Sequence, residues 1–216
     1  CPPSAKLCAE LPDTSSEYAQ EGTDAHALCE HRLKALLGRE TTDPTENLTY
    51  YNEEMERCAV EYATYAYEQV KKAKVACNDP IVLIEQKLDF SRWVPEGFGR
   101  GDCVIVADGT LSVIDFKYGK GVEVRAENNP QMMLYALGAL ELFDGIYDIS
   151  AVNMIIFQPR RDNISEYAIS KEELLRWANE ILTPTAQLAA NGDGDFKAGK
   201  HCRFCKVRAT CRKLAE

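Results

Sequence analysis

Two stretches in the first eighty residues carry apolar side chains at helical spacing. The first, 17–37, ends at Gly38, a natural helix stop. The second, 52–77, is followed by Pro80. Its apolar positions recur every three or four residues: Met55, Ala59, Tyr62, Ala66, Val70 and Ala73. The pattern predicts two amphipathic helices separated by a polar loop.

Shorter apolar runs with the composition of β-strands follow. The first is Ile81–Leu88, after which three glycines loosen the backbone as far as position 101. Asp108-Gly109 is a typical two-residue hairpin turn, so 102–107 and 111–117 are expected to pair antiparallel. The chain therefore predicts three consecutive strands after its two helices.

The second half of the chain alternates between the two kinds of pattern. A helix is expected from about Pro130 to Phe143, then an interior strand over 151–157 and another over 166–169. Ser170-Lys-Glu-Glu173 has the pattern of a capping box and predicts a last long helix, bent near Pro184. The order of elements predicts a mixed α/β core.

Composition and charge exclude several classes of protein. Of the 216 residues, 45% are hydrophobic and 27% charged, as in ordinary globular proteins. No apolar run approaches the roughly 18 residues of a membrane-spanning helix, so no membrane contact is expected. The net charge of −9 argues against coating of nucleic acid by the whole surface, but not against a local basic groove. No signal peptide is evident in this chain, which begins at Cys1.

Charged residues interrupt the predicted hairpin. Asp102 begins its first strand, and Asp115 and Lys117 end the second, on the same face and opposite to Phe116. Two close carboxylates repel unless a cation lies between them, and such an oxygen site suits Mg²⁺ or Mn²⁺. Lys117 would then position a water or offset transition-state charge. The alternative is a solvated hairpin with a surface ion pair between Asp115 and Lys117.

Four further residues are candidates of lower specificity. His26 lies on the first helix, where a lone histidine is more often a packed or surface residue than a ligand. Gln131 and Tyr135 share one helix face, which ordinary packing also explains. Glu85 stands inside an otherwise apolar strand and is a further acid that could lie near the site.

Three of the nine cysteines form a C-x2-C-x5-C cluster near the C-terminus: Cys202, Cys205 and Cys211. A C-x2-C pair with a third cysteine nearby commonly presents thiolates to a soft metal, and Cys1 would supply a fourth ligand. Zinc is the alternative, although its sites are usually built from local pairs. A Cys202–Cys205 disulfide is unfavourable in a reducing cytoplasm. The other five are expected to be free thiols: Cys8, Cys29, Cys58, Cys77 and Cys103.

Basic residues surround the C-terminal cysteines, with no acid until Glu216. Some of them, and two beside the hairpin, are candidate contacts to DNA phosphates: Lys120, Arg125, Arg203, Lys206 and Arg208. The alternative is a solvated terminus that balances an acidic body.

The order of the candidate motifs along the chain is itself informative. The series is Gly22-x3-His26, Gly101-Asp102, Asp115-Phe-Lys117 and Gln131-x3-Tyr135, framed by Cys1 and Cys202-x2-Cys205-x5-Cys211. It resembles the motif series of RecB-type nucleases in the PD-(D/E)XK superfamily. The cysteine frame is similar to the iron–sulfur branch, which includes the AddB nuclease domain and CRISPR-associated RecB-like exonucleases. Nearly the whole chain is covered, and its start is most similar to a stand-alone phage or prophage member.

The resemblance implies a restriction-endonuclease-like fold, with a mixed central sheet flanked by helices. Residues 1–216 would form a single nuclease domain, in which 1–16 and 196–216 hold a [4Fe–4S] cluster between the two termini. The cluster ligands would be Cys1, Cys202, Cys205 and Cys211.

The resemblance also implies roles for the acidic constellation. His26, Asp102 and Asp115 would ligate Mg²⁺ or Mn²⁺, with the Phe116 carbonyl as a further ligand. Lys117 would assist the nucleophilic water, and Gln131 and Tyr135 would orient Lys117 or contact the DNA backbone. Asp115 stands where many relatives have Glu, and its shorter side chain could change the metal distance.

The implied function is that of a metal-dependent DNA nuclease, an exonuclease acting on single- or double-stranded ends in recombination, end processing or repair. The expected place is the cytoplasm of a bacterial host cell, with phage recombination or replication proteins as further partners. Two other classes stay open: a nuclease fold that binds DNA or protein without cutting, and an iron–sulfur redox or sensor protein. The intact set of His26, Asp102, Asp115 and Lys117 favours the enzyme.

Overall fold

The computed structural model describes residues 1–12 and 16–216, and the chain divides into two compact units. The larger unit comprises Ser15–Phe90 and Phe98–Leu174, and the smaller comprises Cys1–Thr14, Ser91–Gly97 and Leu175–Glu216. The predicted cluster-binding segments, 1–16 and 196–216, fall almost entirely in the smaller unit, and residues 13–15 of them lie outside the described residues.

Two helices open the larger unit, and both agree with the prediction to within one residue at each end. They are α2 (Glu17–Leu36) and α3 (Glu53–Ala76), with the short η1 (Thr45–Asn47) between them. Each begins at a polar residue whose side chain accepts a hydrogen bond from a backbone N–H of the first turn. Ser16 accepts from Ala19 at 3.2 Å, and Asn52 accepts from Met55 at 2.9 Å.

Five strands form one sheet in the order β1-β2-β3-β4-β5. They are β1 (Ile81–Asp89), β2 (Phe98–Ala107), β3 (Gly109–Phe116), β4 (Ile149–Gln158) and β5 (Asn163–Ser170). β3 and β4 are parallel and all other neighbours antiparallel, so the predicted mixed sheet is confirmed. Gly109 has a φ of +84° at the β2–β3 turn, a conformation that glycine adopts without strain.

One boundary differs from the prediction, because β2 begins at Phe98 rather than at position 102. Gly99 and Gly101 do not loosen the backbone but pair with Leu88 and Gln86 of β1. A Cβ on Gly99 would overlap the ring of Tyr135. The glycines of this segment therefore serve close packing within a regular strand rather than a flexible loop.

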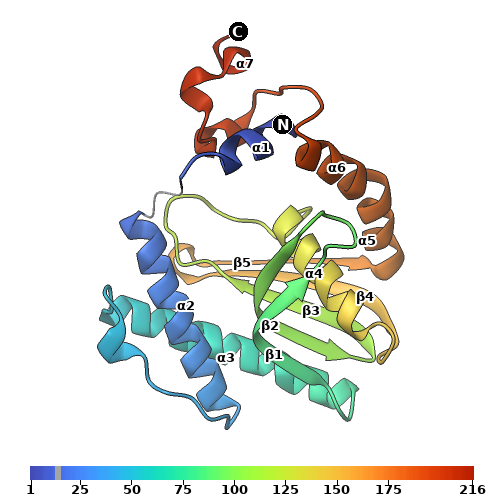
Figure 1. Cartoon of the computed structure of the whole chain (residues 1–216). Helices are drawn as coiled ribbons and strands as arrows, with labels where there is room; N and C mark the ends of the chain where they lie inside the picture. Colours follow the sequence, from blue (N-terminus) through green and yellow to red (C-terminus); the bar gives the residue numbers. More distant parts are fainter. Residues whose placement is uncertain (13–15) are drawn as a thin grey trace. The chain divides into compact units, whose positions relative to one another are not determined.

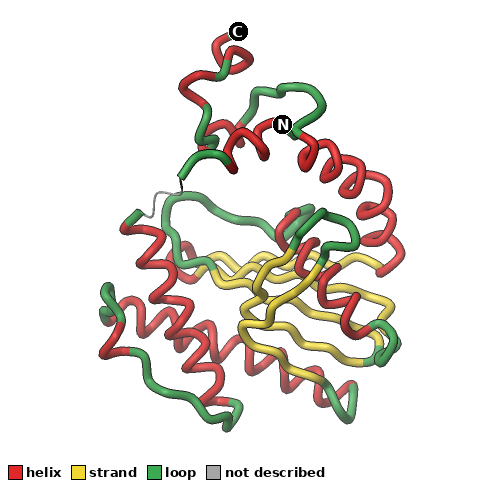
Figure 2. Tube along the Cα trace, viewed as in Figure 1, coloured by secondary structure: helices red, strands yellow, loops and turns green. Residues whose placement is uncertain are grey.

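The parallel strands β3 and β4 are connected through α4 (Pro130–Phe143), which covers one face of the sheet, whereas α2 and α3 cover the other (Figures 1 and 2). Asn129 caps α4 by accepting from the N–H of Gln131 at 3.0 Å. A Cβ on Gly138 would lie 2.9 Å from the Cβ of Leu88, so this glycine lets α4 approach β1 closely.

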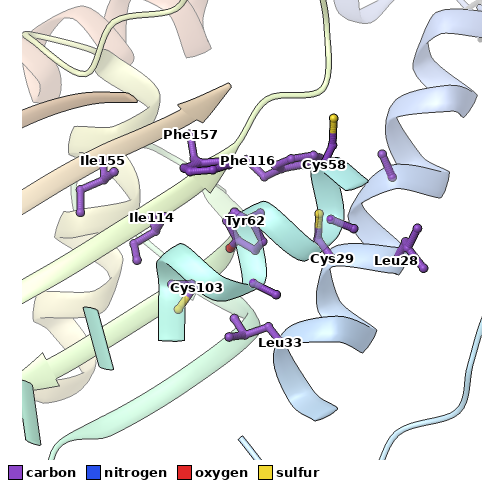
Figure 3. Close-up of a cluster of buried hydrophobic side chains, with 14 of the residues drawn as sticks. Leu28, Cys29, Leu33, Cys58, Tyr62, Cys103, Ile114, Phe116, Ile155 and Phe157 are labelled. Atoms are coloured by element: carbon purple, nitrogen blue, oxygen red, sulfur yellow. The ribbon is translucent and has the colours of Figure 1, made fainter. Parts of the chain in front are cut away.

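The core beneath α2 and α3 is built from alternate residues of the strands (Figure 3). Tyr62 of α3 is at its centre, with ring centroids 5.2 Å from Phe116 and 5.9 Å from Phe157. Three of the predicted free thiols are buried in this cluster: Cys29, Cys58 and Cys103. Helix packing on a sheet of alternating apolar residues thus accounts for the main core.

Helix α5 (Lys171–Trp177) begins where the capping pattern predicts, since the Ser170 hydroxyl accepts from the N–H of Glu173 at 3.1 Å. The expected bend is a π-helical turn, η3 (Ala178–Leu182), directly before α6 (Thr183–Asn191). In the smaller unit, α6 packs against α1 (Pro3–Ala9). Among residues 1–12 and 16–216, every helix is too short or too polar to cross a lipid bilayer.

Candidate functional site

Asp102 of β2 is 8% exposed, and both of its carboxylate oxygens are engaged. Oδ2 accepts a 2.6 Å hydrogen bond from the backbone N–H of Phe116 on β3. Oδ1 lies 3.2 Å from Nδ1 of His26 on α2. A helix distant in sequence and a neighbouring strand therefore hold this side chain in one orientation, and the structure places His26 beside Asp102.

Asp115 of β3 is buried more deeply, at 1% exposure. The Lys117 ammonium lies 2.8 Å from its Oδ2, yet this oxygen has no well-oriented hydrogen bond among the described residues. The Lys117 backbone N–H donates to the carbonyl of Phe157 at 2.9 Å and continues the β3–β4 pairing. Asp115 thus retains lone pairs that a cation could use.

Lys117 also begins a chain of polar contacts that leads to α4. Its Nζ donates to Oε1 of Gln131 at 3.0 Å, and the Gln131 amide donates to the Tyr135 hydroxyl at 2.8 Å. Gly99 leaves the space that the Tyr135 ring fills. The structure therefore brings together the five residues predicted to act around the reacting centre: Asp102, Asp115, Lys117, Gln131 and Tyr135.

Glu85 of β1, a weak candidate in the sequence, lies beside His26 and Asp102. Single ligand atoms of His26, Glu85 and Asp102 all lie within 4.8 Å of one another. Glu85 falls opposite Asp102, between the ladder pairs on either side, and has a φ of +52°. A residue other than glycine in this conformation is strained by about 1–2 kcal/mol. An acid inside an apolar strand, in register with the candidate residue Asp102, is the signal that points to it.

Burial and repulsion by the charge of Asp102 raise the pKa of Asp115 and of Glu85. Burial, and then the charge of Asp102, raise the pKa of Asp115 to about 6 despite the opposing effect of Lys117. The same two causes raise the pKa of Glu85 to about 7. Burial alone would lower the pKa of His26, but its hydrogen bond to Asp102 raises it above the ordinary value. The site holds more negative charge than its surroundings stabilise.

These shifts predict the pH dependence of stability in the metal-free protein. The folded state binds protons more tightly than the unfolded chain at Asp115, Glu85 and His26, so it gains stability as pH falls from about 7 towards 4. We expect Tm in EDTA to rise by on the order of 5 °C between pH 8 and pH 5.5. Differential scanning calorimetry at several pH values measures it.

The control is a double variant, Asp115→Asn with Glu85→Gln, measured under the same conditions. Because it lacks both perturbed carboxyls, its Tm should rise by less than that of the wild type over the same interval. Equal pH dependence in the two proteins would contradict the assignment of these acids as the cause.

The predicted cluster ligands lie together within the smaller unit. One small cavity is lined by Cys1, Cys202, Cys205 and Cys211. Cys8 does not line this cavity, although its Sγ lies 3.9 Å from that of Cys205. His201 uses Nε2 in a 2.9 Å contact with the carbonyl of Lys197. Cysteines are the residue type that binds either a [4Fe–4S] cluster or a zinc ion, and four of them line this one cavity.

The candidate DNA contacts differ in their present partners. Lys120 pairs with Glu54 at 3.0 Å, and Arg125 with Glu123 at 3.1 Å. Lys206 donates to the carbonyls of Cys8 and Leu11 at the end of α1. The Arg208 guanidinium donates to the carbonyl of Arg203, whose own guanidinium lies over the ring of Phe204. Each of these side chains therefore has a structural contact.

Two solved structures share distant similarity with this chain. SSO0001 is 16% identical, with 87% of this chain and 95% of that protein covered and a TM-score of 0.34. A proposed exonuclease from Eubacterium rectale is 11% identical, with 97% of this chain and 79% of that protein covered and a TM-score of 0.44. Neither likeness is close enough to establish a fold family or an activity.

One protein-family model matches this chain over its whole given length. Residues 1–216 match the family described as a protein of unknown function, DUF2800. The match includes both the acidic constellation of the larger unit and the cysteines of the smaller one. The chain belongs to the DUF2800 family.

Proposed function

We propose that this protein is a divalent-metal-dependent DNA nuclease with the active-site arrangement of RecB-type PD-(D/E)XK enzymes. The observation that carries the proposal is the set of charged side chains at the open end of the β2–β3 hairpin, away from its turn. Two buried carboxylates, Asp102 and Asp115, occur there with the Lys117 ammonium 2.8 Å from the second. A mixed sheet with helices on both faces supports the proposal.

The residues that would hold the metal are His26, Asp102 and Asp115, with Glu85 added by the structure and the Phe116 carbonyl by the family resemblance. Their oxygen and imidazole donors fit Mg²⁺ or Mn²⁺. When bound, such a cation supplies polarisation of a phosphate oxygen and a lower pKa for its water. The unbalanced negative charge of the metal-free site supports this assignment, because a cation would offset it.

The chain's own contribution to hydrolysis comes from Lys117. The water oxygen attacks phosphorus, and the bond between phosphorus and the leaving oxygen breaks, giving one phosphomonoester end and one hydroxyl end. The Lys117 ammonium would orient that water and stabilise the negative charge that develops on the phosphoryl oxygens. Gln131, fixed by Tyr135, holds the ammonium in place.

We further propose that the four cysteines bind a [4Fe–4S] cluster with a structural role, zinc being the alternative. The support is the single cavity lined by Cys1, Cys202, Cys205 and Cys211. The finer form of the proposal is an exonuclease that acts on DNA ends in phage or prophage recombination, end processing or repair. The resemblance of the motif series supports it.

The test uses anaerobically purified protein and end-labelled single- and double-stranded DNA, with Mn²⁺, Mg²⁺ or EDTA. We expect cleavage with either metal and none in EDTA, and the pattern of label release will give the polarity. Absence of cleavage on every substrate, by protein that retains its iron, would favour a DNA- or protein-binding module. A reversible redox signal without cleavage would favour a sensor.

A further inference from the structure

An irregular loop, residues 117–129, joins β3 to α4 (Figure 2). Lys117 is its first residue, and Gln131, to which Lys117 donates a hydrogen bond, lies just beyond its end in α4. The loop contains no helix or strand of its own. Backbone of this kind usually fluctuates more than the elements it connects. The position of the Lys117 ammonium therefore depends on the pairing of its N–H with Phe157 and on how the loop that follows is held.

A single buried side chain makes several of the contacts that hold it. Gln158, the last residue of β4, is 1% exposed. Its Nε2 donates to the carbonyls of Gly119 and Val122, at 2.7 and 2.9 Å. Its Oε1 accepts from the N–H of Val124 at 3.1 Å and from the Asn163 amide at 3.2 Å. Both amide hydrogens and both lone pairs of the amide oxygen are used, which is the full capacity of a glutamine.

Other side chains continue this row of contacts into β5. Asn163 donates to the carbonyl of Val124 at 2.8 Å, and Ser165 accepts from the N–H of Ala126 at 2.9 Å. Between the strands, in η2 (Pro159–Arg161), Arg161 donates to the carbonyl of Lys120 at 2.7 Å. The loop backbone is thus hydrogen-bonded along much of its length to the end of the β4–β5 hairpin, residues 158–165.

We propose that Gln158 is a positioning residue for the proposed nuclease reaction. It fixes the loop 117–129 so that Lys117 leaves β3 towards Asp115 and Gln131. The inference rests on the proposed function, because the ammonium it positions is the one that would act on the water. Misplacement of a reacting group by about 1 Å can reduce a rate by about a hundredfold.

The principal test is Gln158→Met, which keeps the length of the side chain and removes its hydrogen bonds. We expect kcat to fall by about tenfold to a hundredfold, with the KM for DNA changed by about twofold or less. Ser165→Ala removes one contact from the same row and should reduce kcat only a few-fold. The matched control is Asn153→Ala, on the same strand but with no contact to the loop among those described, which should leave kcat unchanged.

Amide hydrogen exchange gives a readout that does not depend on activity. In Gln158→Met, peptides within 118–128 should exchange at least about tenfold faster, while peptides of α2, α3 and β1 keep the wild-type rates. If Gln158→Met does not fold, Ser165→Ala and Asn163→Ala provide the same comparison of kinetics and exchange.

The outcomes separate this inference from the function on which it rests. An inactive wild type would overturn the proposed function, and the role of Gln158 in catalysis with it. An active wild type whose Gln158→Met variant keeps its kcat would overturn the positioning role alone. Faster exchange over the whole larger unit, together with a loss of kcat in proportion to the loss of folded protein, would also overturn the positioning role. Gln158 would then act on stability only.

Discussion

Replacing Asp115 with asparagine is expected to reduce nuclease activity on the order of a thousandfold and to raise the Tm of the metal-free protein. The loss follows because the variant removes a proposed carboxylate ligand of the cation that would stabilise transition-state charge, and losses of such stabilisation reach about a hundredfold to a thousandfold. The gain follows because the pKa of Asp115 is raised to about 6. At pH 8 the folded state therefore holds an ionised carboxylate that it does not stabilise.

The opposite signs of the two effects make this prediction specific. Initial rates of cleavage with Mn²⁺ and thermal unfolding in EDTA would be measured on the same preparations. Asp144→Asn is the matched control, because Asp144 forms an exposed ion pair with Lys171 at 2.9 Å. It should change neither quantity appreciably. An Asp115→Asn variant that cleaves DNA at the wild-type rate would contradict the assigned mechanism.

Cys205→Ser should lose the proposed metal centre, whereas Cys8→Ser should keep it. The two thiols are 3.9 Å apart, but Cys205 lines the four-thiol cavity and Cys8 does not. Iron and zinc analysis should show less than about a tenth of the wild-type metal in Cys205→Ser. A structural centre that joins distant segments contributes to folding free energy, so Tm should fall by on the order of 5–10 °C.

The outcomes of these two substitutions test separately which cysteines bind the metal, whether the centre is structural and which metal it holds. Loss of metal in Cys8→Ser would place Cys8 among the ligands. An unchanged Tm in Cys205→Ser, despite loss of metal, would contradict a structural role for the centre. Zinc without iron in anaerobically prepared wild type would replace the cluster with the alternative that the cysteine spacing left open.

The elements with strong local signals could be predicted from the sequence. The periodicity of α3, the Asp108-Gly109 turn and the apolar run of β4 determined their positions to within a few residues. The pairing of Asp115 with Lys117 followed from alternation along one strand. In these cases the relevant interactions lie within a few residues of one another, so the pattern contains them.

Features that depend on distant pairing could not be predicted. Glu85 was only a weak candidate in the sequence, and it is the register of β1 on β2 that places it opposite Asp102. The start of β2 was missed because Gly99 was interpreted as flexible, whereas the Tyr135 ring requires it. The contacts of Gln158 with the loop depend on the fold of an irregular segment, for which no periodicity exists.

The packing of α1 on α6 has a consequence for how the protein is made. Helix α1 ends at Ala9 and α6 begins at Thr183. At about 5–20 residues per second, a ribosome needs about 9–35 s to synthesise the intervening chain. During that interval α1 is translated before the helix against which it packs. The proposed metal centre between Cys1 and the C-terminal cysteines would therefore form only after residues 202–211 have left the ribosome.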